Sequence, residues 1–342
     1  MAPFGCVRRD KIHLTMKFKK FKLMVILFKL PIARFEWYLT TRETNIKLKT
    51  YNGTFTIKIQ EFEAQDSKNV NIGIPAKMAT PMNGPYYLAW KLYSEGRPMF
   101  EILEALTTHL MKVTVVREGF DIHYDLPMNH LTRDFFIWKF LTLPVRLHIS
   151  GGQPEPLKMT PEELKFILND VNSKNVSLNI QVINKTLFPW KYNEPIRHSW
   201  IVLRHCNWLE TTQVFSLECP IIRMHLDNRP LDLELNMILK KWMAENGDVA
   251  ESIYLEFETI EIARSEIFVF NGITTTDSVV QQDMNAENLL MLDRPHGLRD
   301  IKRTTDGRRA TVAWNKERFH LLVWNQNNIR HLNRETRERF EL

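Results

Sequence analysis

The sequence predicts an α/β protein, α+β overall, whose middle part is a curved sheet with helices on one face only. Three observations support this prediction. Short strands alternate with helices between residues 136 and 270, an Asn-Gly turn joins two alternating runs before them, and an Asp-Gly turn joins two more after them. Regularly spaced short strands with helices between them are typical of β/α repeats.

The region 44–135 is expected to be rich in strands. Apolar and polar residues alternate over 46–48 and 55–59, on either side of Asn52-Gly53. Asn-Gly between alternating runs is a strong hairpin signal, because both residues tolerate a positive φ. Further along, residues 100–116 are expected to form a helix that runs into a strand.

The region 136–270 carries the clearest pattern, in which strands recur with helices between them. Two of the three strand-to-strand spacings are close to 31 residues, and the middle one is longer. The longer interval is expected to hold an extra helix around Arg197–His205 and an extra strand around Thr211–Leu217. The four predicted strands are Val145–Ser150, Val176–Val182, Ile221–Leu226 and Ile253–Glu258.

The helices between these strands have recognisable ends. Thr160 is a good N-cap before Pro161, and Glu163 completes a capping box with it. Asp232 is expected to cap the helix after the third predicted strand, and Gly247 suits the left-handed position at its C-terminal end. Each helix carries one apolar stripe at helical spacing, formed by Leu164, Ile167, Leu168 and Val171 in the first and by Leu235, Ile238, Leu239 and Trp242 in the second.

Strands that alternate with helices at this spacing are expected to be parallel. The strands of a doubly wound sheet are apolar on both faces, whereas these are apolar on one face only. We therefore predict an irregular, leucine-rich-repeat-like β/α solenoid with one helix-covered face. The candidate binding face is the polar one, represented by Arg146, His148, Asn179, Arg223, His225, Tyr254 and Glu256.

The C-terminal region begins with a polar loop over 271–288. A hairpin is expected to follow, with strands at Asp300–Thr304 and Arg309–Trp314 around the turn Asp306-Gly307, and then a third strand at Phe319–Trp324. Residues 327–342 are expected to be a charged helix or tail. The predicted organisation is a basic lead at 1–43, a strand-rich region at 44–135, the repeats and hairpin at 136–326, and the tail at 327–342.

Composition and charge narrow the class of protein. The chain has 342 residues with 44% hydrophobic and 25% charged residues, which excludes disordered and collagen-like proteins. The net charge of +6 is concentrated at the two ends: residues 1–30 hold eight Lys or Arg and one acid, and residues 294–342 hold twelve Lys or Arg and six acids. A nucleic-acid-binding protein that uses these basic ends is one alternative, although solvated charge explains them more simply.

The three cysteines and the apolar runs indicate the compartment. Cys6, Cys206 and Cys219 form neither a disulfide framework nor a zinc motif, which favours a reducing compartment, cytoplasmic or nuclear. No apolar run approaches the roughly 18 residues of a membrane helix. The apolar core after the early lysines is too short for a signal peptide.

A search for catalytic and cofactor motifs finds none. The sequence holds no GxG, HExxH, GxSxG or CxxC pattern, so no cofactor or resident metal is expected. His198, His205 and Cys206 come nearest to a metal cluster but lack a fourth ligand at useful spacing. An alternative is a hydrolase that uses Glu256, Glu258 and His225, because two carboxylates on one strand face can serve as acid and base.

Two motifs resemble a known family. The run from Leu235 to Trp242, Leu-Asn-Met-Ile-Leu-Lys-Lys-Trp, and the strand Ser252–Phe257 resemble a helix and strand of the nematode-type F-box proteins with the type 2 F-box-associated domain. The hairpin residues 300–303 and 306–312, with the closing strand after them, resemble the same domain. The resemblance covers roughly 140–325, and more loosely 45–140.

The resemblance implies a non-enzymatic adaptor of a cullin-based ubiquitin ligase. The family's F-box binds the Skp adaptor, and its associated domain holds a protein substrate for ubiquitylation. In this sequence, the opening of an F-box is similar to the segment 27–39, and its middle helices are missing, so we expect a truncated F-box with weakened recruitment of the ligase. The remnant expected to bind the Skp adaptor consists of Leu27, Leu30, Pro31, Phe35 and Leu39.

Overall fold

The protein is described by a computed structural model in which one large mixed sheet carries the whole fold. The chain is mixed α/β, with a 15-stranded sheet and seven α-helices among the described residues. No described helix combines the length and apolar character that a membrane span requires. The described residues are 30–41, 44–51, 53–60, 86–93, 98–127, 131–152, 155–183, 191–206, 208–209, 214, 217–226, 230–244, 250–257, 265–291 and 295–341.

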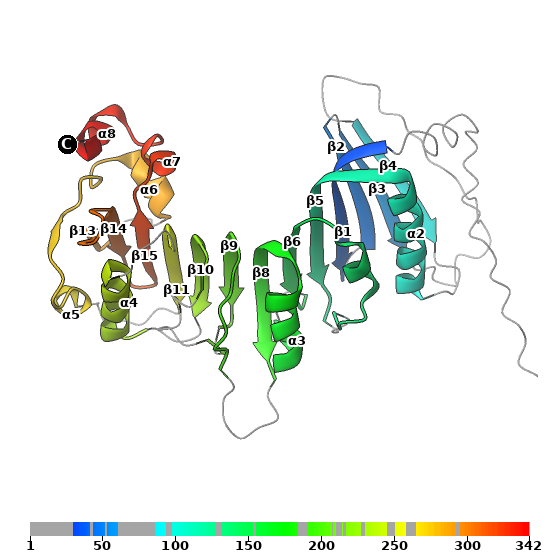
Figure 1. Cartoon of the computed structure of the whole chain (residues 1–342), viewed down its shortest axis with the longest axis horizontal. Coiled ribbons are helices and arrows are strands. Elements are labelled where there is room, and N and C mark those ends of the chain that lie inside the picture. Colours follow the sequence, from blue (N-terminus) through cyan, green and yellow to red (C-terminus); the bar gives the residue numbers. More distant parts are fainter. Residues whose placement is uncertain are drawn as a thin grey trace, which may run out of the picture.

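The sheet runs through the molecule from the β4 edge to the β12 edge, and Figure 1 shows its strands side by side along the long axis. The strands of the first half are β1 (Leu30–Thr40), β2 (Thr44–Thr50), β3 (Gly53–Gln60), β4 (Tyr86–Tyr93), β5 (Thr114–Asp125), β6 (Val145–Ser150), β7 (Leu157–Met159) and β8 (Ser173–Val182). Those of the second half are β9 (Trp200–Arg204), β10 (Ile221–Leu226), β11 (Ser252–Phe257), β12 (Thr275–Asp277), β13 (Gly297–Lys302), β14 (Arg309–Trp314) and β15 (Arg318–Val323).

The helices lie between and after these strands. The α-helices are α2 (Met99–Val113), α3 (Pro161–Lys165), α4 (Asp232–Ala244), α5 (Glu266–Val269), α6 (Met284–Leu290), α7 (Gln326–Ile329) and α8 (Arg334–Glu341). A 3₁₀-helix, η2, spans Phe136–Phe140, and a π-helical turn, η3 (Phe166–Asp170), continues α3.

The N-terminal hairpin is confirmed. Strands β2 and β3 pair antiparallel with Ile46 opposite Ile57 and Thr50 opposite Gly53, so Gly53 is the first residue of β3 and does not belong to the turn, in which the Asn-Gly signal had placed it. The predicted helix that runs into a strand is also confirmed, as α2 followed directly by β5. An element that the sequence did not suggest is β1, which lies between β2 and β5 and pairs with β5 in parallel.

The four strands predicted in the middle region are confirmed, and all neighbouring pairs from β1 and β5 through β11 are parallel. One correction concerns the segment Arg197–His205, which was expected to be a helix. Its residues 200–204 form β9, which lies between β8 and β10. The reason is its alternation: Ile201 and Leu203 are fully buried while Arg204 is exposed. Most of the strand expected at 211–217 lies outside the described residues.

The first residues of α3 and α4 can be compared with the capping predicted for them. The Thr160 side chain accepts from the Glu163 backbone N–H, and the Glu163 carboxylate accepts from Thr160 N at 2.8 Å, so the capping box is present. Asp232 is the first residue of α4 rather than its cap, and its carboxylate accepts from Ser265 N at 2.9 Å. Both predicted stripes are buried, from Leu164 to Val171 and from Leu235 to Trp242, whereas Gly247 lies outside the described residues.

The C-terminal hairpin is confirmed as well. Strands β13 and β14 pair antiparallel around Gly307, whose φ of +75° is the left-handed conformation that this turn needs. Strand β15 pairs with β14 and, antiparallel, with β11, which joins the hairpin to the parallel strands. The polar loop expected over 271–288 needs correction, because it contains β12 and most of α6.

The sheet crosses two of the boundaries expected between regions. Between 43 and 44 the chain passes from β1 to its neighbour β2, and between 135 and 136 it passes from β5 towards β6, also neighbours. The tail 327–342 is largely helical and packs on the sheet, with the Phe340 ring 5.0 Å from that of Trp324. The described elements thus belong to one sheet with helices attached to it.

Candidate functional site

The candidate site is the polar face of the parallel strands, which we call the open face. Alternate residues of each strand belong to the buried core that the strands share with the helices. Val176 and Leu178 of β8 and Ile222 and Met224 of β10 are examples. The residues between them point to the opposite side. The strand register aligns one row of this face across the sheet, made of Tyr38, His123, His148, Ser177, Val202, Arg223, Tyr254 and His320.

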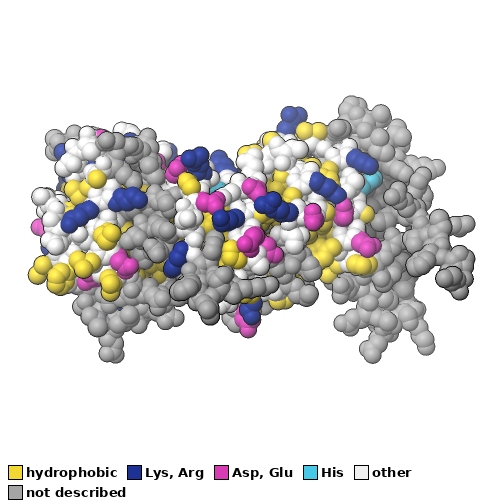
Figure 2. Space-filling model, turned by 60° about the horizontal axis from the view of Figure 1, so that its bottom comes forward, with side chains coloured by type: hydrophobic (Ala, Val, Ile, Leu, Met, Phe, Trp, Pro, Cys, Tyr) yellow, Lys and Arg dark blue, Asp and Glu magenta, His cyan; other side chains and the backbone are white. Residues whose placement is uncertain are grey.

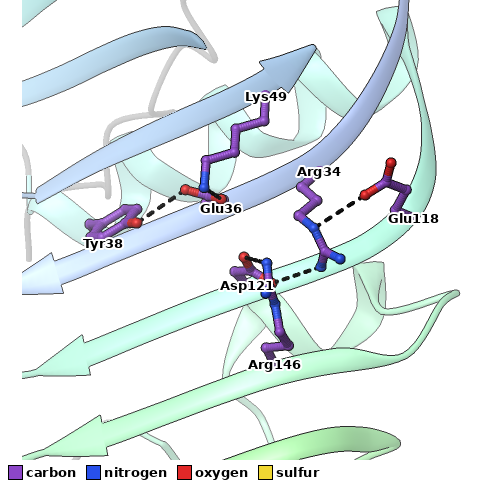
Figure 3. A network of polar contacts seen from close by, with 7 residues as sticks. All are labelled: Arg34, Glu36, Tyr38, Lys49, Glu118, Asp121 and Arg146. Atoms are coloured by element: carbon purple, nitrogen blue, oxygen red, sulfur yellow. Dashed lines mark hydrogen bonds and ion pairs between the residues drawn. The ribbon is translucent and has the colours of Figure 1, made fainter. Parts of the chain in front are cut away.

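The N-terminal part of the open face holds two buried carboxylates, shown in Figure 3. Glu36 on β1 and Asp121 on β5 are neighbours in register. The ammonium of Lys49 lies 2.6 Å from Glu36, and the guanidinium of Arg146 donates twice to Asp121, at 2.6 and 2.7 Å. Because a buried charge is costly unless it is paired, these contacts explain how both acids are accommodated.

Two further side chains complete this network. Arg34 donates to Asp121 at 3.3 Å and lies 3.4 Å from the carboxylate of Glu118. The Tyr38 hydroxyl donates to Glu36 at 3.1 Å. Burial, and then the charge of Glu36, raises the pKa of the Tyr38 phenol, so this group stays protonated. The cations of the network, drawn in Figure 3, each have a carboxylate partner within it, so this part of the face is charge-balanced.

Next to the network is an aromatic strip. The rings of Tyr38 and His123 stack with centroids 4.2 Å apart, and the His148 ring follows at 5.9 Å. The Lys47 ammonium lies 3.7 Å from the centre of the Tyr38 ring, a cation–π contact. Burial, followed by the neighbouring His148, lowers the pKa of His123 to about 4. His123 is therefore neutral near neutral pH, and this strip offers flat rings rather than charge.

The C-terminal part of the open face has a different balance of charge. Asn179, Arg204, His225, Glu256 and Arg318 are neighbours in register across five strands. Glu256 is held from two sides, because Arg318 Nε donates to it at 3.2 Å and His225 Nδ1 lies 3.7 Å from it. Elsewhere on the surface, in the view from below given in Figure 2, basic and acidic side chains are intermixed along the middle of the molecule.

The seven residues predicted for the binding face all lie on β6, β8, β10 or β11, but they do not form one cluster. Arg146 and His148 are exposed, and Arg223, His225 and Glu256 are half-buried. Arg146 belongs to the Asp121 network, and the strands β8 and β9 separate it from Arg223 and His225. Asn179 and Tyr254 were predicted to be accessible, yet they are only 6% and 9% exposed, so their side chains offer little area to a partner.

Sequence reasoning missed several open-face residues, among them Arg204, Tyr38 and His123. Arg204 lies on β9, in the segment expected to be a helix. Tyr38 lies on β1, in the segment expected to be an F-box remnant. The alternation of Phe35, Trp37 and Leu39 with polar residues was the signal that could have identified β1 as a strand.

The expected adaptor-binding remnant needs correction where it can be described. Phe35 and Leu39 lie on β1 and are fully buried in the core, because their strand is inserted between β2 and β5. They therefore have no surface to offer the Skp adaptor. Pro31 is exposed at the start of the same strand. Leu27 lies outside the described residues, and Leu30 is the first residue of β1.

The residues considered for metal binding or catalysis can be judged by their burial and contacts. His198 is buried and its Nδ1 lies 2.8 Å from the Ser173 carbonyl, and the two residues line a pocket at the N-terminal ends of β8 and β10. Burial raises the pKa of the nearby Cys219 thiol to about 11, so it stays protonated. Glu258 lies outside the described residues. Within the described ranges, no group of three or more His, Cys, Asp or Glu is arranged to hold a metal.

Comparison with family models, with curated proteins and with solved structures gave no match for this chain. The functional argument therefore rests on the geometry of the open face.

Proposed function

We propose that this protein is a non-catalytic recognition subunit that binds a partner protein on the open face. The observation behind the proposal is the one-sided sheet. Its apolar side is buried with the helices, while Arg146, His148, Arg223 and His225 remain at least partly accessible on the other side. Polar and aromatic side chains held on rigid strands are suited to specific protein contact, because the scaffold fixes their positions.

The parallel strands and their helices are best understood as leucine-rich-repeat-like units, in keeping with the spacing in the sequence. In such folds each unit packs mainly on its neighbours, and the strands together form an extended binding surface. The run from β1 and β5 to β11 consists of parallel neighbours only, which supports this interpretation.

We further propose that the recognition subunit is an F-box type adaptor that acts in the cytoplasm or nucleus. The Leu235–Trp242 helix and the Asp306-Gly307 hairpin support it, because the residues of both motifs form the elements expected of them. With Phe35 and Leu39 in the core, recruitment of the Skp adaptor has to rest on residues before β1 and on Pro31. The proposal therefore includes weak recruitment of the ligase. Binding of the purified Skp adaptor to the full chain, with and without residues 1–29, tests this part.

The recognition half is tested by affinity capture from cells with a charge-reversal variant, Arg223→Glu with Glu256→Arg. Both side chains are half-buried on the open face, so the variant should lose partners that the unaltered chain captures. A matched control, Lys112→Glu with Glu162→Arg, reverses one exposed base and one exposed acid on α2 and α3. If the control loses the same partners, or the open-face variant keeps them while both stay folded, the proposal is wrong.

A further inference from the structure

Two arginines of the open face stand out because no carboxylate among the described residues is paired with them. Arg204 on β9 is exposed and Arg223 on β10 is half-buried. Arg204 pairs in register with His225, two residues beyond Arg223 on the same face of β10. The two arginines are therefore diagonal neighbours, about 7–8 Å apart at the backbone. Neither forms an ion pair with any described residue.

The nearest acid on this part of the face is already neutralised. Glu256 is bound by Arg318 at 3.2 Å and faces His225 at 3.7 Å. Among the described open-face residues of β9, β10, β11 and β15, three arginines, Arg204, Arg223 and Arg318, thus accompany one carboxylate. The guanidinium Nε of Arg223 is buried and has no hydrogen-bond acceptor among the described residues. Burying a charged donor without an acceptor costs free energy.

A third polar group beside them is also incompletely bonded. Asn179 pairs in register with Arg204, is only 6% exposed, and its Oδ1 atom has no hydrogen-bond partner among the described residues. The N-terminal network differs in its ion pairs, because Arg34, Lys49 and Arg146 each reach Glu36 or Asp121. Among the described residues, the sheet face therefore pairs the cations of this network with carboxylates and leaves Arg204 and Arg223 without one.

We propose that Arg204 and Arg223 form the contact site for an acidic segment of the partner polypeptide, in which two Asp or Glu carboxylates lie close together. This inference rests on the proposed function and names the chemistry of its partner. Alternate residues of an extended segment are about 6.6–7 Å apart, which matches the diagonal between the two arginines. Each guanidinium offers a planar fork of donors to a carboxylate.

The test uses the purified full chain and fluorescence anisotropy with labelled peptides of twelve residues. One peptide alternates Asp and Glu with Gly and Ser, a second replaces its acids by Asn and Gln, and a third carries phosphoserines in place of the acids. We expect the acidic peptide to bind and the amide peptide to bind at least about 30-fold more weakly, because charge-assisted hydrogen bonds are lost. Binding of the acidic peptide should also weaken with added salt.

Variants then assign the binding to these side chains. Arg204→Gln with Arg223→Gln should weaken binding of the acidic peptide by about 100-fold, about tenfold for each arginine. The control Lys112→Gln with Lys316→Gln removes the same charge from exposed positions elsewhere and should change affinity less than about twofold. Arg204→Lys with Arg223→Lys keeps the charge and should retain part of the affinity, which separates loss of contact from loss of folding.

Several results would overturn the inference. Equal affinity for the acidic and amide peptides, or equal losses in the Gln double variant and its control, would show that the arginines are not an acid-binding pair. Binding of the phosphoserine peptide alone would assign the site to phosphate instead. If acidic peptides fail while partner capture still depends on Arg223 and Glu256, the inference fails and the proposed function stands. If capture is also independent of these residues, both fail.

Discussion

His320 shows how strictly single polar residues are accommodated in this sheet. It lies on β15, is fully buried, and its Nδ1 lies 2.6 Å from the Leu290 carbonyl oxygen. Since a carbonyl can only accept, Nδ1 carries the proton, and Nε2 accepts from the Ser252 hydroxyl at 2.8 Å. Both ring nitrogens are therefore satisfied in the neutral form, and a second proton would displace the hydroxyl contact.

The pH dependence of stability follows from this arrangement. Burial lowers the pKa of His320 to about 4, below its usual value of 6.5. Between these values the unfolded chain binds a proton that the folded chain does not, so the free energy of unfolding falls as the pH falls, by up to about 1.4 kcal/mol per pH unit. Urea unfolding measures the free energy of unfolding at about pH 7 and about pH 5. This free energy should fall less between the two pH values in His320→Gln than in the unaltered chain.

A histidine on the surface provides the control for this measurement. His331 is exposed, so His331→Gln should leave the pH dependence as it is in the unaltered chain. A loss of stability on acidification that is the same with and without His320 would contradict the assignment of a neutral, buried ring.

Trp242 is the largest buried side chain of α4, with 1% exposure and the Arg303 guanidinium 5.3 Å from its ring. Trp242→Ala should lower the free energy of unfolding by about 3–5 kcal/mol, because it removes a large core side chain and leaves a cavity. Met237→Ala on the same helix, at a position 56% exposed, should change it by less than about 0.5 kcal/mol. Similar losses for both variants in chemical denaturation would mean that the apolar stripe of α4 does not face the core.

At the scale of elements, the β13–β14 hairpin depends on one glycine. Gly297 lies opposite Trp314 in register, and a Cβ at Gly297 would lie 1.8 Å from the indole ring. Gly297→Ala should therefore destabilise the protein by about 1–3 kcal/mol, since the ring has to move. A thermal or urea unfolding series that includes Trp314→Ala tests the cause, because the glycine substitution should cost much less once the ring is absent. An equal cost in both backgrounds would exclude this clash as the reason.

The elements that could be predicted from sequence are those with local chemical signals. The capping box of Thr160 and Glu163 and the turn at Asp306-Gly307 fix backbone geometry within a few residues. The Asn-Gly signal likewise identified the β2–β3 hairpin, although Gly53 itself lies in β3. Strand β9 has no comparable signal at its ends. It is only five residues long, and its apolar side chains at 201 and 203 are compatible with either a helix or a strand. Its parallel neighbours β8 and β10, which are distant in sequence, decide the outcome.

At the scale of the whole molecule, the same distinction applies to the candidate site. Alternation predicts which side of a strand faces water, and so Arg146, Arg223 and Glu256 could be identified as open-face residues. Alternation cannot predict how far neighbouring side chains bury a residue. For this reason Asn179 and Tyr254 were expected to be accessible, although both are buried. Ion pairs between strands depend on register, so the contrast between the balanced and unbalanced parts of the face emerges only from the assembled sheet.

The continuous sheet also determines what each end of the molecule can do. Strand β1 is bonded to β2 and β5, so the segment that resembles the opening of an F-box is part of the scaffold that supports the open face. Recognition of a partner and recruitment of an adaptor would then share one rigid body. The central claim is that the open face, and not the helical side, meets the partner protein.

Photocrosslinking in cells tests this claim most directly. A benzophenone amino acid is placed at Ser177, on the open face of β8, or at Glu162, exposed on α3. We expect the Ser177 position to give covalent adducts with a protein partner and the Glu162 position to give none. Adducts from Glu162 with none from Ser177, in chains of equal stability and abundance, would contradict the claim.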